Sequence, residues 1–96
     1  MDTANSSPNT QDLALYFSET CWFCARVRHV ANELGIKVEL RDIDHSRERR
    51  DELIAGGGKS QVPCLRIAHG TRPVEWMYES ADIAAYLTRR FGAEPA

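Results

Sequence analysis

The sequence predicts a small α/β domain: a mixed four-stranded sheet flanked by three helices. Apolar residues alternate between strand-like and helix-like spacing in the order strand, helix, strand, helix, strand, strand, helix. A strand, a helix and a strand in succession imply a parallel pair with a right-handed crossover. The last two strands are joined by a turn-length link, which favours an antiparallel hairpin. Together these two units predict a sheet with both parallel and antiparallel neighbours.

The first half of the chain is the predicted strand–helix–strand unit. Residues 13–17 form an uninterrupted apolar run, which is typical of a central strand covered on both faces. In residues 22–34, apolar side chains recur at helical spacing from Val27 to Leu34, and Gly35 is suited to end that helix. Residues 36–40 alternate between apolar and charged side chains and are predicted to form the second strand.

The second half of the chain supplies a helix, a hairpin and a closing helix. Residues 46–55 are highly charged and predict a weakly held surface helix, which the glycines at 56–58 would stop. Residues 62–67 and 73–77 are predicted to be the hairpin strands. Residues 80–91 predict an amphipathic helix with one apolar face.

Chain length and composition bound the number of domains. The 96 residues, 43% of them hydrophobic, suffice for one compact core. Residues 1–11 are polar and predict a disordered tail, residues 12–92 form the predicted domain, and residues 93–96 are expected to be a short C-terminal tail.

The charge balance and the absence of long apolar segments exclude some classes of function. The chain has 12 basic and 14 acidic side chains, so it lacks the positive surface that nucleic-acid binding needs. No segment approaches the roughly 20 apolar residues of a membrane span, and the N-terminus has no apolar leader segment. We therefore expect a soluble cytoplasmic protein without nucleic-acid or membrane partners.

The sequence Cys21-Trp22-Phe23-Cys24 lies where a predicted strand ends and a helix begins. Unpaired N–H groups and the helix dipole at that position stabilise a thiolate, so Cys21 is the candidate nucleophile. Cys24 lies one helical turn further on and could resolve a mixed disulfide at Cys21. The alternatives are two inert core cysteines or a zinc site. Zinc normally needs four ligands, and beyond Cys64 only scattered histidines remain, so we expect no metal.

Three further segments carry candidate binding residues. If the Val62–Pro63 bond is cis, the chain turns beside Cys21 and leaves the Val62 backbone free to pair with an extended ligand; the alternative is an ordinary edge-strand proline. Lys59 is either a solvated loop lysine or a point charge for a ligand carboxylate. Ser80 is a candidate N-cap of the last helix, whose N–H groups could also bind an anion.

Three motifs, Cys21–Cys24, Gln61-Val62-Pro63 and 79–83 (Glu-Ser-Ala-Asp-Ile), together resemble the glutaredoxins. The last two are particularly similar to glutathione S-transferase-type glutaredoxins and to the N-terminal domain of glutathione transferases. The resemblance runs from about residue 13 to residue 87 and implies a thioredoxin-like fold. It also implies glutathione as co-substrate, and disulfide-containing or glutathionylated proteins as partners.

The resemblance also assigns roles to individual residues. It implies that Cys21 attacks a glutathione mixed disulfide and that the Val62 backbone pairs with the cysteinyl unit of glutathione beside cis-Pro63. Glu79 and Ser80 would hold the glutamyl end of the tripeptide. Phe23 would flank it.

The chain departs from the family pattern at three positions. Trp22 and Phe23 stand where the family usually has Pro and Tyr, and Ser18 stands where a lysine commonly meets the glycyl carboxylate of glutathione. Lys59 is a candidate replacement for that lysine. In the family, the motif proline tends to discourage bridging of two subunits by an iron–sulfur cluster. Because Trp22 replaces that proline here, binding of such a cluster is an alternative function.

These observations lead to one main functional hypothesis and two alternatives. The main hypothesis is a monomeric, glutathione-dependent thiol–disulfide oxidoreductase of cell redox homeostasis that uses the Cys21–Cys24 dithiol. The first alternative is a dimer that binds or transfers a glutathione-ligated iron–sulfur cluster. The second is a non-catalytic recognition domain that resembles the N-terminal domain of glutathione transferases.

Overall fold

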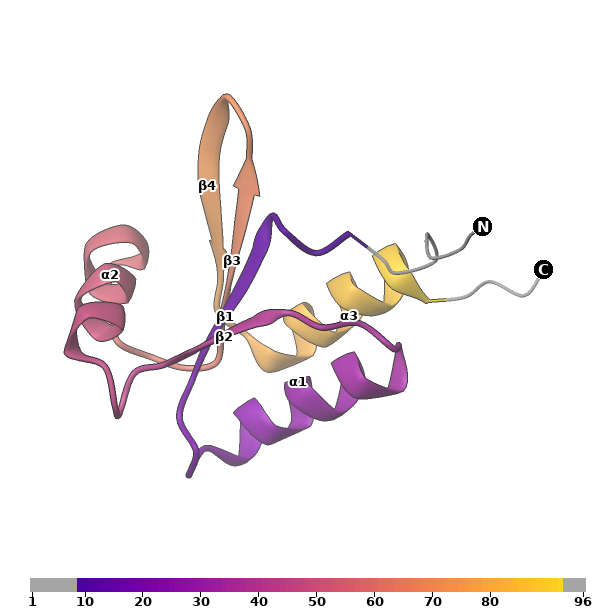
Figure 1. Ribbon diagram of the computed structural model, residues 1–96, viewed down its shortest axis with the longest axis horizontal. Helices are drawn as coiled ribbons and strands as arrows, with labels where there is room; N and C mark the ends of the chain where they lie inside the picture. Colours follow the sequence, from indigo (N-terminus) through magenta and orange to yellow (C-terminus); the bar gives the residue numbers. More distant parts are fainter. Residues whose placement is uncertain (1–8, 93–96) are drawn as a thin grey trace.

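The computed structural model describes residues 9–92 as a four-stranded sheet with α1 and α3 on one face and α2 on the other (Figure 1). The strands are β1 (Leu13–Phe17), β2 (Glu39–Asp42), β3 (Cys64–His69) and β4 (Arg72–Met77), and the helices are α1 (Trp22–Glu33), α2 (Arg47–Gly57) and α3 (Ser80–Phe91). The order of elements is the one that the sequence predicts.

The sheet is mixed, with the spatial order β2-β1-β3-β4. β1 runs parallel to β2 and antiparallel to β3, and β3 and β4 form an antiparallel hairpin. This arrangement confirms the predicted thioredoxin-like α/β fold. β1 lies at the centre and is buried along its whole length, as expected from its uninterrupted apolar run.

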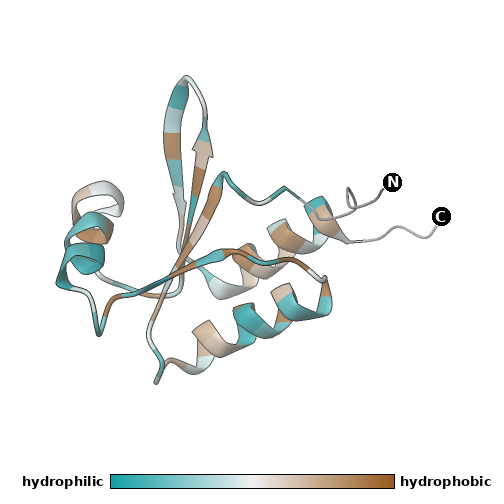
Figure 2. Cartoon of the chain, viewed as in Figure 1, coloured by the Kyte–Doolittle hydropathy of each residue, from teal (hydrophilic) through white to brown (hydrophobic). Residues whose placement is uncertain are grey.

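Alternate residues of the central strands supply two separate cores. One side of the sheet packs against α1 and α3, and its largest buried side chains are Leu65, Ile67, Ile83, Leu87 and Val27. Figure 2 shows hydrophobic residues along β1, which contributes to both sides. The opposite side packs against α2 through Tyr16, Leu53 and Cys64. The sheet is therefore covered on both faces near the Cys64 end of β3.

The second strand begins later than the sequence predicts. The prediction was residues 36–40, whereas β2 starts at Glu39, which is aligned with Ala14 of β1. Ile36 is instead buried in the core under α1. The segment 36–38 has the alternation of a strand because it packs on that core, but it precedes the first residue that faces β1.

Helix α2 extends two residues beyond its predicted end. Gly56 and Gly57 belong to the helix, and Gly58 ends it in the left-handed conformation with φ 96°. A Cβ on Gly56 would overlap Trp76, and a Cβ on Gly57 would overlap Tyr78. These two glycines allow α2 to approach β4 closely, whereas only Gly58 has the stop function predicted for the triplet.

Smaller differences concern the hairpin and the chain ends. β3 spans 64–69 rather than 62–67, and β4 starts one residue earlier than predicted. Residues 1–8 of the predicted N-terminal tail and the predicted C-terminal tail, residues 93–96, lie outside the described part of the chain. Of the tail residues that are described, Thr10 donates a hydrogen bond to the Lys37 carbonyl at 2.6 Å. Among residues 9–92, no helix is long and apolar enough to cross a membrane.

Candidate functional site

Cys21 is the N-cap residue of α1, and its sulfur takes part in the cap. The backbone N–H of Cys24 donates a hydrogen bond to the Cys21 Sγ at 3.1 Å, and the Cys21 N–H donates to the Ser18 carbonyl at 3.1 Å. The Cys21 side chain is half-buried. The Cys21 sulfur therefore lies at the positive end of α1 with a backbone N–H directed at it.

Cys24 lies in a different environment one turn into the helix. Its side chain is fully buried. Burial raises the pKa of the Cys24 thiol to about 12, a hydrogen bond to the Cys21 sulfur adds to the increase, and a backbone hydrogen bond from Ser18 opposes it. The two thiols of the motif are therefore unequal: Cys21 is accessible, whereas Cys24 is protonated and enclosed.

The Val62–Pro63 segment lies beside Cys21. The Val62–Pro63 peptide bond is cis. The thiol of Cys21 donates to the Val62 carbonyl oxygen across 3.9 Å. Since β3 begins at Cys64, the Val62 backbone lies outside the strand ladder. The chain therefore turns beside the Cys21–Cys24 motif, and the Val62 backbone lies next to the Cys21 sulfur, as expected for a cis bond at this position.

An open groove of about 160 Å³ gathers the other predicted residues. It is lined by Phe23, Gln61, Val62, Pro63, Tyr78, Glu79 and Ser80. The groove thus brings together five of the six residues predicted to contact glutathione. Gln61 and Tyr78 were not predicted to line it. Gln61 belongs to the Gln61-Val62-Pro63 motif, which assigned it no role, and Tyr78 precedes Glu79 in the sequence, where adjacency was the only available signal.

Lys59 is the predicted residue that does not line the groove. Its Nζ lies 4.7 Å from the centroid of the Tyr78 ring, and its carbonyl accepts a hydrogen bond from the Tyr78 hydroxyl at 3.0 Å. Lys59 therefore adjoins the groove through Tyr78. The cation lies over the face of the aromatic ring, and the Lys59 side chain is exposed.

The start of α3 forms one end of the groove. Glu79, rather than the predicted Ser80, is the N-cap residue, and Ser80 is the first helical residue. No side chain makes a capping hydrogen bond at this end. The prediction of a Ser80 cap was wrong because the chain enters the helix one residue earlier. The first-turn N–H groups of α3 consequently have no side-chain acceptor, and the first residue of the helix, Ser80, lines the groove.

Ser18 occupies a polar cluster on the other side of Cys21. Its buried hydroxyl donates to the Asp44 carboxylate and contacts the Thr20 hydroxyl at 3.1 Å. Where the family commonly has a lysine, this chain thus has a small residue that is bonded to an acidic side chain. The electrostatic contribution of a lysine ammonium is missing from this side of Cys21.

Trp22 and Phe23 present apolar surface next to Cys21. Their side chains are 69% and 53% exposed, and their rings pack edge to face with centroids 5.3 Å apart. Large exposed aromatic side chains in contact are uncommon on a monomeric surface unless they meet a ligand or partner. Phe23 also lines the groove, so the aromatic surface continues from Trp22 into it.

The third cysteine is remote from solvent. Cys64 is fully buried, and desolvation raises its pKa to about 12, while contact with the Tyr78 hydroxyl opposes that shift. It packs in the core under α2. Within residues 9–92, no group of three or more His, Cys, Asp or Glu side chains is arranged to hold a metal ion.

Comparison with known proteins identifies the family and the fold. A family model described as glutathione S-transferase, N-terminal domain, matches residues 15–95. Glutaredoxin 3 of Escherichia coli is 29% identical over 56 residues, which are 58% of this chain and 68% of that protein.

Solved structures of glutathione transferases have the same fold. A trimeric glutathione transferase of Leishmania superposes with a TM-score of 0.68 at 30% identity over 83% of this chain. A Bombyx mori glutathione transferase has a TM-score of 0.70 at 20% identity over 88% of this chain. This chain covers only 18% and 38% of those two proteins, so it corresponds to one part of each. On the family match, the shared fold and the motif order, the chain belongs to the glutathione S-transferase N-terminal domain family, within the glutaredoxin-like group of thioredoxin folds.

Proposed function

We propose that this protein is a glutathione-dependent thiol–disulfide oxidoreductase in which Cys21 is the nucleophile. One observation carries the proposal: the Cys21 sulfur accepts the Cys24 N–H at the start of α1 and lies next to the Val62 carbonyl. A sulfur in this position combines accessibility with stabilisation of negative charge, the two properties that control thiol reactivity. The similarity to glutaredoxin 3 and to glutathione transferases supports glutathione as the co-substrate.

The groove supports the proposed binding of glutathione. Phe23, the Val62–Pro63 segment, Glu79 and Ser80 all line the groove, and the Val62 carbonyl also contacts the Cys21 sulfur. In our proposal the glutamyl carboxylate meets the uncapped start of α3, where helix N–H groups favour an anion. The Glu79 carboxylate meets the glutamyl ammonium group. The Val62 backbone, which is outside the strand ladder, pairs with the cysteinyl unit.

The proposed reaction is a pair of thiol–disulfide exchanges. The Cys21 thiolate attacks the glutathione sulfur of a protein–glutathione disulfide. The disulfide bond breaks, and the protein sulfur leaves as a thiolate that takes a proton from water. A second glutathione thiolate then attacks the glutathione sulfur bound to Cys21. That step releases the Cys21 thiolate together with glutathione disulfide.

Cys24 has a separate role for protein disulfides. When Cys21 is linked to a protein substrate, the Cys24 thiolate would attack the Cys21 sulfur, form the Cys21–Cys24 disulfide and release the second substrate thiol. The high pKa of buried Cys24 disfavours its thiolate. We therefore propose that removal of glutathione from proteins proceeds through Cys21 alone and that Cys24 serves the slower reduction of protein disulfides.

Matched single-cysteine variants test the proposal. The assay follows release of glutathione from a glutathionylated protein with reduced glutathione as donor, and mass spectrometry of the trapped enzyme. Cys21→Ser should abolish turnover and the adduct of one glutathione. Cys24→Ser should keep both, and the buried Cys64→Ser serves as a control outside the motif. Undiminished turnover in Cys21→Ser would refute the mechanism.

The same experiment separates the alternative functions. A folded protein that gives neither adduct nor turnover would favour a recognition domain without catalysis. A coloured dimer after anaerobic reconstitution with iron, sulfide and glutathione would favour the cluster-binding function, which the replacement of the motif proline by Trp22 keeps open. We also propose that the protein carries out this reaction in the reducing cytoplasm.

A further inference from the structure

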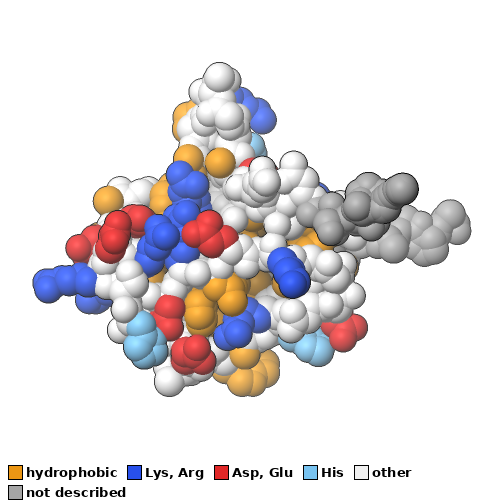
Figure 3. All heavy atoms as spheres, viewed as in Figure 1, with side chains coloured by type: hydrophobic (Ala, Val, Ile, Leu, Met, Phe, Trp, Pro, Cys, Tyr) orange, Lys and Arg blue, Asp and Glu red, His pale blue; other side chains and the backbone are white. Residues whose placement is uncertain are grey.

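A second pocket lies on the face of the sheet that carries α2. It has a volume of about 410 Å³ and is lined by Tyr16, Arg41, Arg49, Glu52, Arg66 and Trp76. None of these residues lines the groove beside Cys21. Figure 3 shows Lys and Arg side chains gathered at the middle of one face of the molecule, with acidic side chains to either side. The volume falls within the range typical of small-molecule sites.

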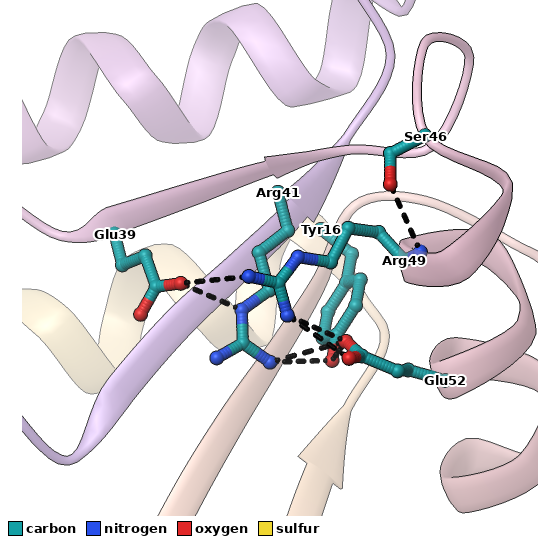
Figure 4. A network of polar contacts seen from close by, with 6 residues as sticks. All are labelled: Tyr16, Glu39, Arg41, Ser46, Arg49 and Glu52. Carbon is teal, nitrogen blue, oxygen red and sulfur yellow. Dashed lines mark hydrogen bonds and ion pairs between the residues drawn. The ribbon is translucent and has the colours of Figure 1, made fainter.

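Two of the three arginines are fixed by an ion-pair network. Arg41 and Arg49 lie side by side between Glu39 and Glu52 (Figure 4). Arg41 Nε donates to Glu39 at 2.9 Å and its Nη1 donates to the Tyr16 hydroxyl at 2.8 Å. Arg49 Nη1 donates to both carboxylate oxygens of Glu52, at 3.1 and 2.9 Å. The two guanidinium groups are held in place before any ligand arrives.

The tyrosine that joins this network is rigid as well. Tyr16 is fully buried in the central strand and donates its hydroxyl to Glu52 at 3.0 Å. Its ring packs against Trp76 with the centroids 5.7 Å apart. One wall of the pocket is thus aromatic, and its position is determined by the core rather than by solvent-exposed side chains.

Arg66 is the unbalanced charge. It lies on β3 opposite Trp76 of β4, and its guanidinium carbon is 5.8 Å from the centroid of the Trp76 ring. Across residues 9–92, Arg66 makes no hydrogen bond or ion pair with another side chain, and Arg41 Nη2 donates no hydrogen bond. The pocket therefore presents three guanidinium groups and one carboxylate, with unused N–H donors next to an indole face.

We propose that this pocket binds a small aromatic phosphate, such as a nucleoside monophosphate. Guanidinium groups match the paired oxygens of phosphate, and the charge of Arg66 is available to an anion because Glu39 and Glu52 offset only Arg41 and Arg49. Arg66 and Arg41 donate to the phosphate oxygens, and the planar group packs against the part of Trp76 that Tyr16 and Arg66 leave exposed. Tyr16 and Glu52 position Arg41 and do not contact the ligand. The site is independent of the reaction proposed for Cys21.

Titration of the full chain with adenosine monophosphate tests the site. The readout is the NMR shift of the Trp76 indole N–H and of the arginine Nε–H signals. We expect saturable shifts, binding at least about tenfold weaker in Arg66→Gln, and adenosine without phosphate at least about tenfold weaker than the monophosphate, because charge-assisted hydrogen bonds are lost in both cases. Arg26→Gln is the matched control: it removes the same charge from an exposed position on α1 and should bind within about twofold of the wild type.

Several outcomes would overturn the proposal. Equal affinity in Arg66→Gln and in Arg26→Gln would show that the net charge alone attracts the ligand. If adenosine bound as tightly as adenosine monophosphate, the phosphate would not contribute to recognition. If inorganic phosphate bound as tightly as adenosine monophosphate, the aromatic group would not contribute. Binding of an acidic peptide in place of the nucleotide would make the pocket a protein-docking site. Arg66→Lys keeps the charge and should retain part of the affinity, so it separates loss of binding from loss of the fold.

Discussion

The backbone N–H of Cys24 donates to the Sγ of Cys21 at 3.1 Å, while the sulfur of Cys24 itself is enclosed in the core. One residue thus supplies both the N–H group that donates to the sulfur of its neighbour and a thiol whose own ionisation is opposed by burial. The asymmetry follows from depth along the helix: Cys21 caps the open end of α1 and is half-buried, whereas Cys24 lies one turn inside and is fully buried.

Selective alkylation should reveal this asymmetry. At about pH 8, where an ordinary cysteine is partly ionised, iodoacetamide should modify Cys21 in the folded protein and leave Cys24 and Cys64 unmodified. Both buried thiols have pKa values raised to about 12, so they lack the reactive thiolate. In urea all three cysteines should react. Peptide mapping by mass spectrometry checks this, and modification of Cys24 at the rate of Cys21 in the folded protein would contradict it.

The two buried thiols should also make the fold sensitive to alkali. Their folded pKa values are raised to about 12, whereas the unfolded thiols ionise near 8.5. A raised folded pKa gives stability that is complete below the unfolded pKa and is lost as the pH rises toward the folded one. Each thiol should therefore lower the free energy of unfolding by up to about 1.4 kcal/mol per pH unit above about pH 9.

Urea denaturation across this pH range measures the effect, and Cys64→Ala provides the comparison. The variant should be less stable at neutral pH, because it leaves a small cavity in the core under α2. Its stability should nevertheless fall less steeply with pH, since one of the two buried thiols is gone. Identical slopes for the variant and the wild type would argue against ionisation of Cys64 as a cause.

The order of elements could be predicted from the sequence, because the central strand and the last helix have strong apolar patterns. β1 and α3 begin and end at the predicted residues. The start of β2 could not be predicted, since residues 36–38 alternate in the same way whether they pair with a strand or only pack on the core. Register between strands determines that boundary, and register is a tertiary property.

The candidate site was predictable only where a local motif marks it. Cys21, Pro63 and Glu79 belong to short motifs, and the groove brings their segments together. The pocket that contains Arg41 and Arg66 has no such signature, because its six residues come from five elements and only Arg49 and Glu52, both on α2, are close in sequence. Sequence spacing carries no information about side chains that only the sheet register makes neighbours.

The close approach of α2 to Tyr78, the residue that follows β4, gives a prediction about Gly57. A Cβ at this position would overlap the hydroxyl of Tyr78. Gly57→Ala should therefore lower the free energy of unfolding by about 1 to 3 kcal/mol, the usual range for overpacking, even though alanine is the better helix former. Because Tyr78 lines the groove, its displacement should also weaken glutathione binding in the proposed site.

Thermal unfolding and glutathione titration measure these two effects. Tyr78→Phe removes the hydroxyl, so adding Gly57→Ala to that variant should cost less than it costs in the wild type. The difference between the two costs is the coupling energy of the pair. An equal cost in both backgrounds would mean that the alanine is accommodated without contact with Tyr78.

An ion pair between the start of β1 and the end of α3 should make the fold sensitive to acid. Arg90 donates from two nitrogens to both carboxylate oxygens of Asp12, at 2.9 and 3.0 Å. The hydrogen bond from Arg90 lowers the pKa of the Asp12 carboxyl, and partial desolvation opposes that shift. A lowered folded pKa gives stability that is complete above the unfolded value of about 3.9 and is lost as the pH falls through the folded value.

Asp12→Asn tests this linkage, because the amide keeps the shape of the side chain and removes its charge. At about pH 7 the variant should be less stable by about 0.5 to 1 kcal/mol, as expected for a partly exposed bidentate pair. The gap between variant and wild type should close as the pH falls below about 4, where Asp12 becomes protonated in both the unfolded and the folded protein. Denaturant unfolding at several pH values measures the gap. A gap that stays constant down to about pH 2 would assign the loss to packing rather than to the charge.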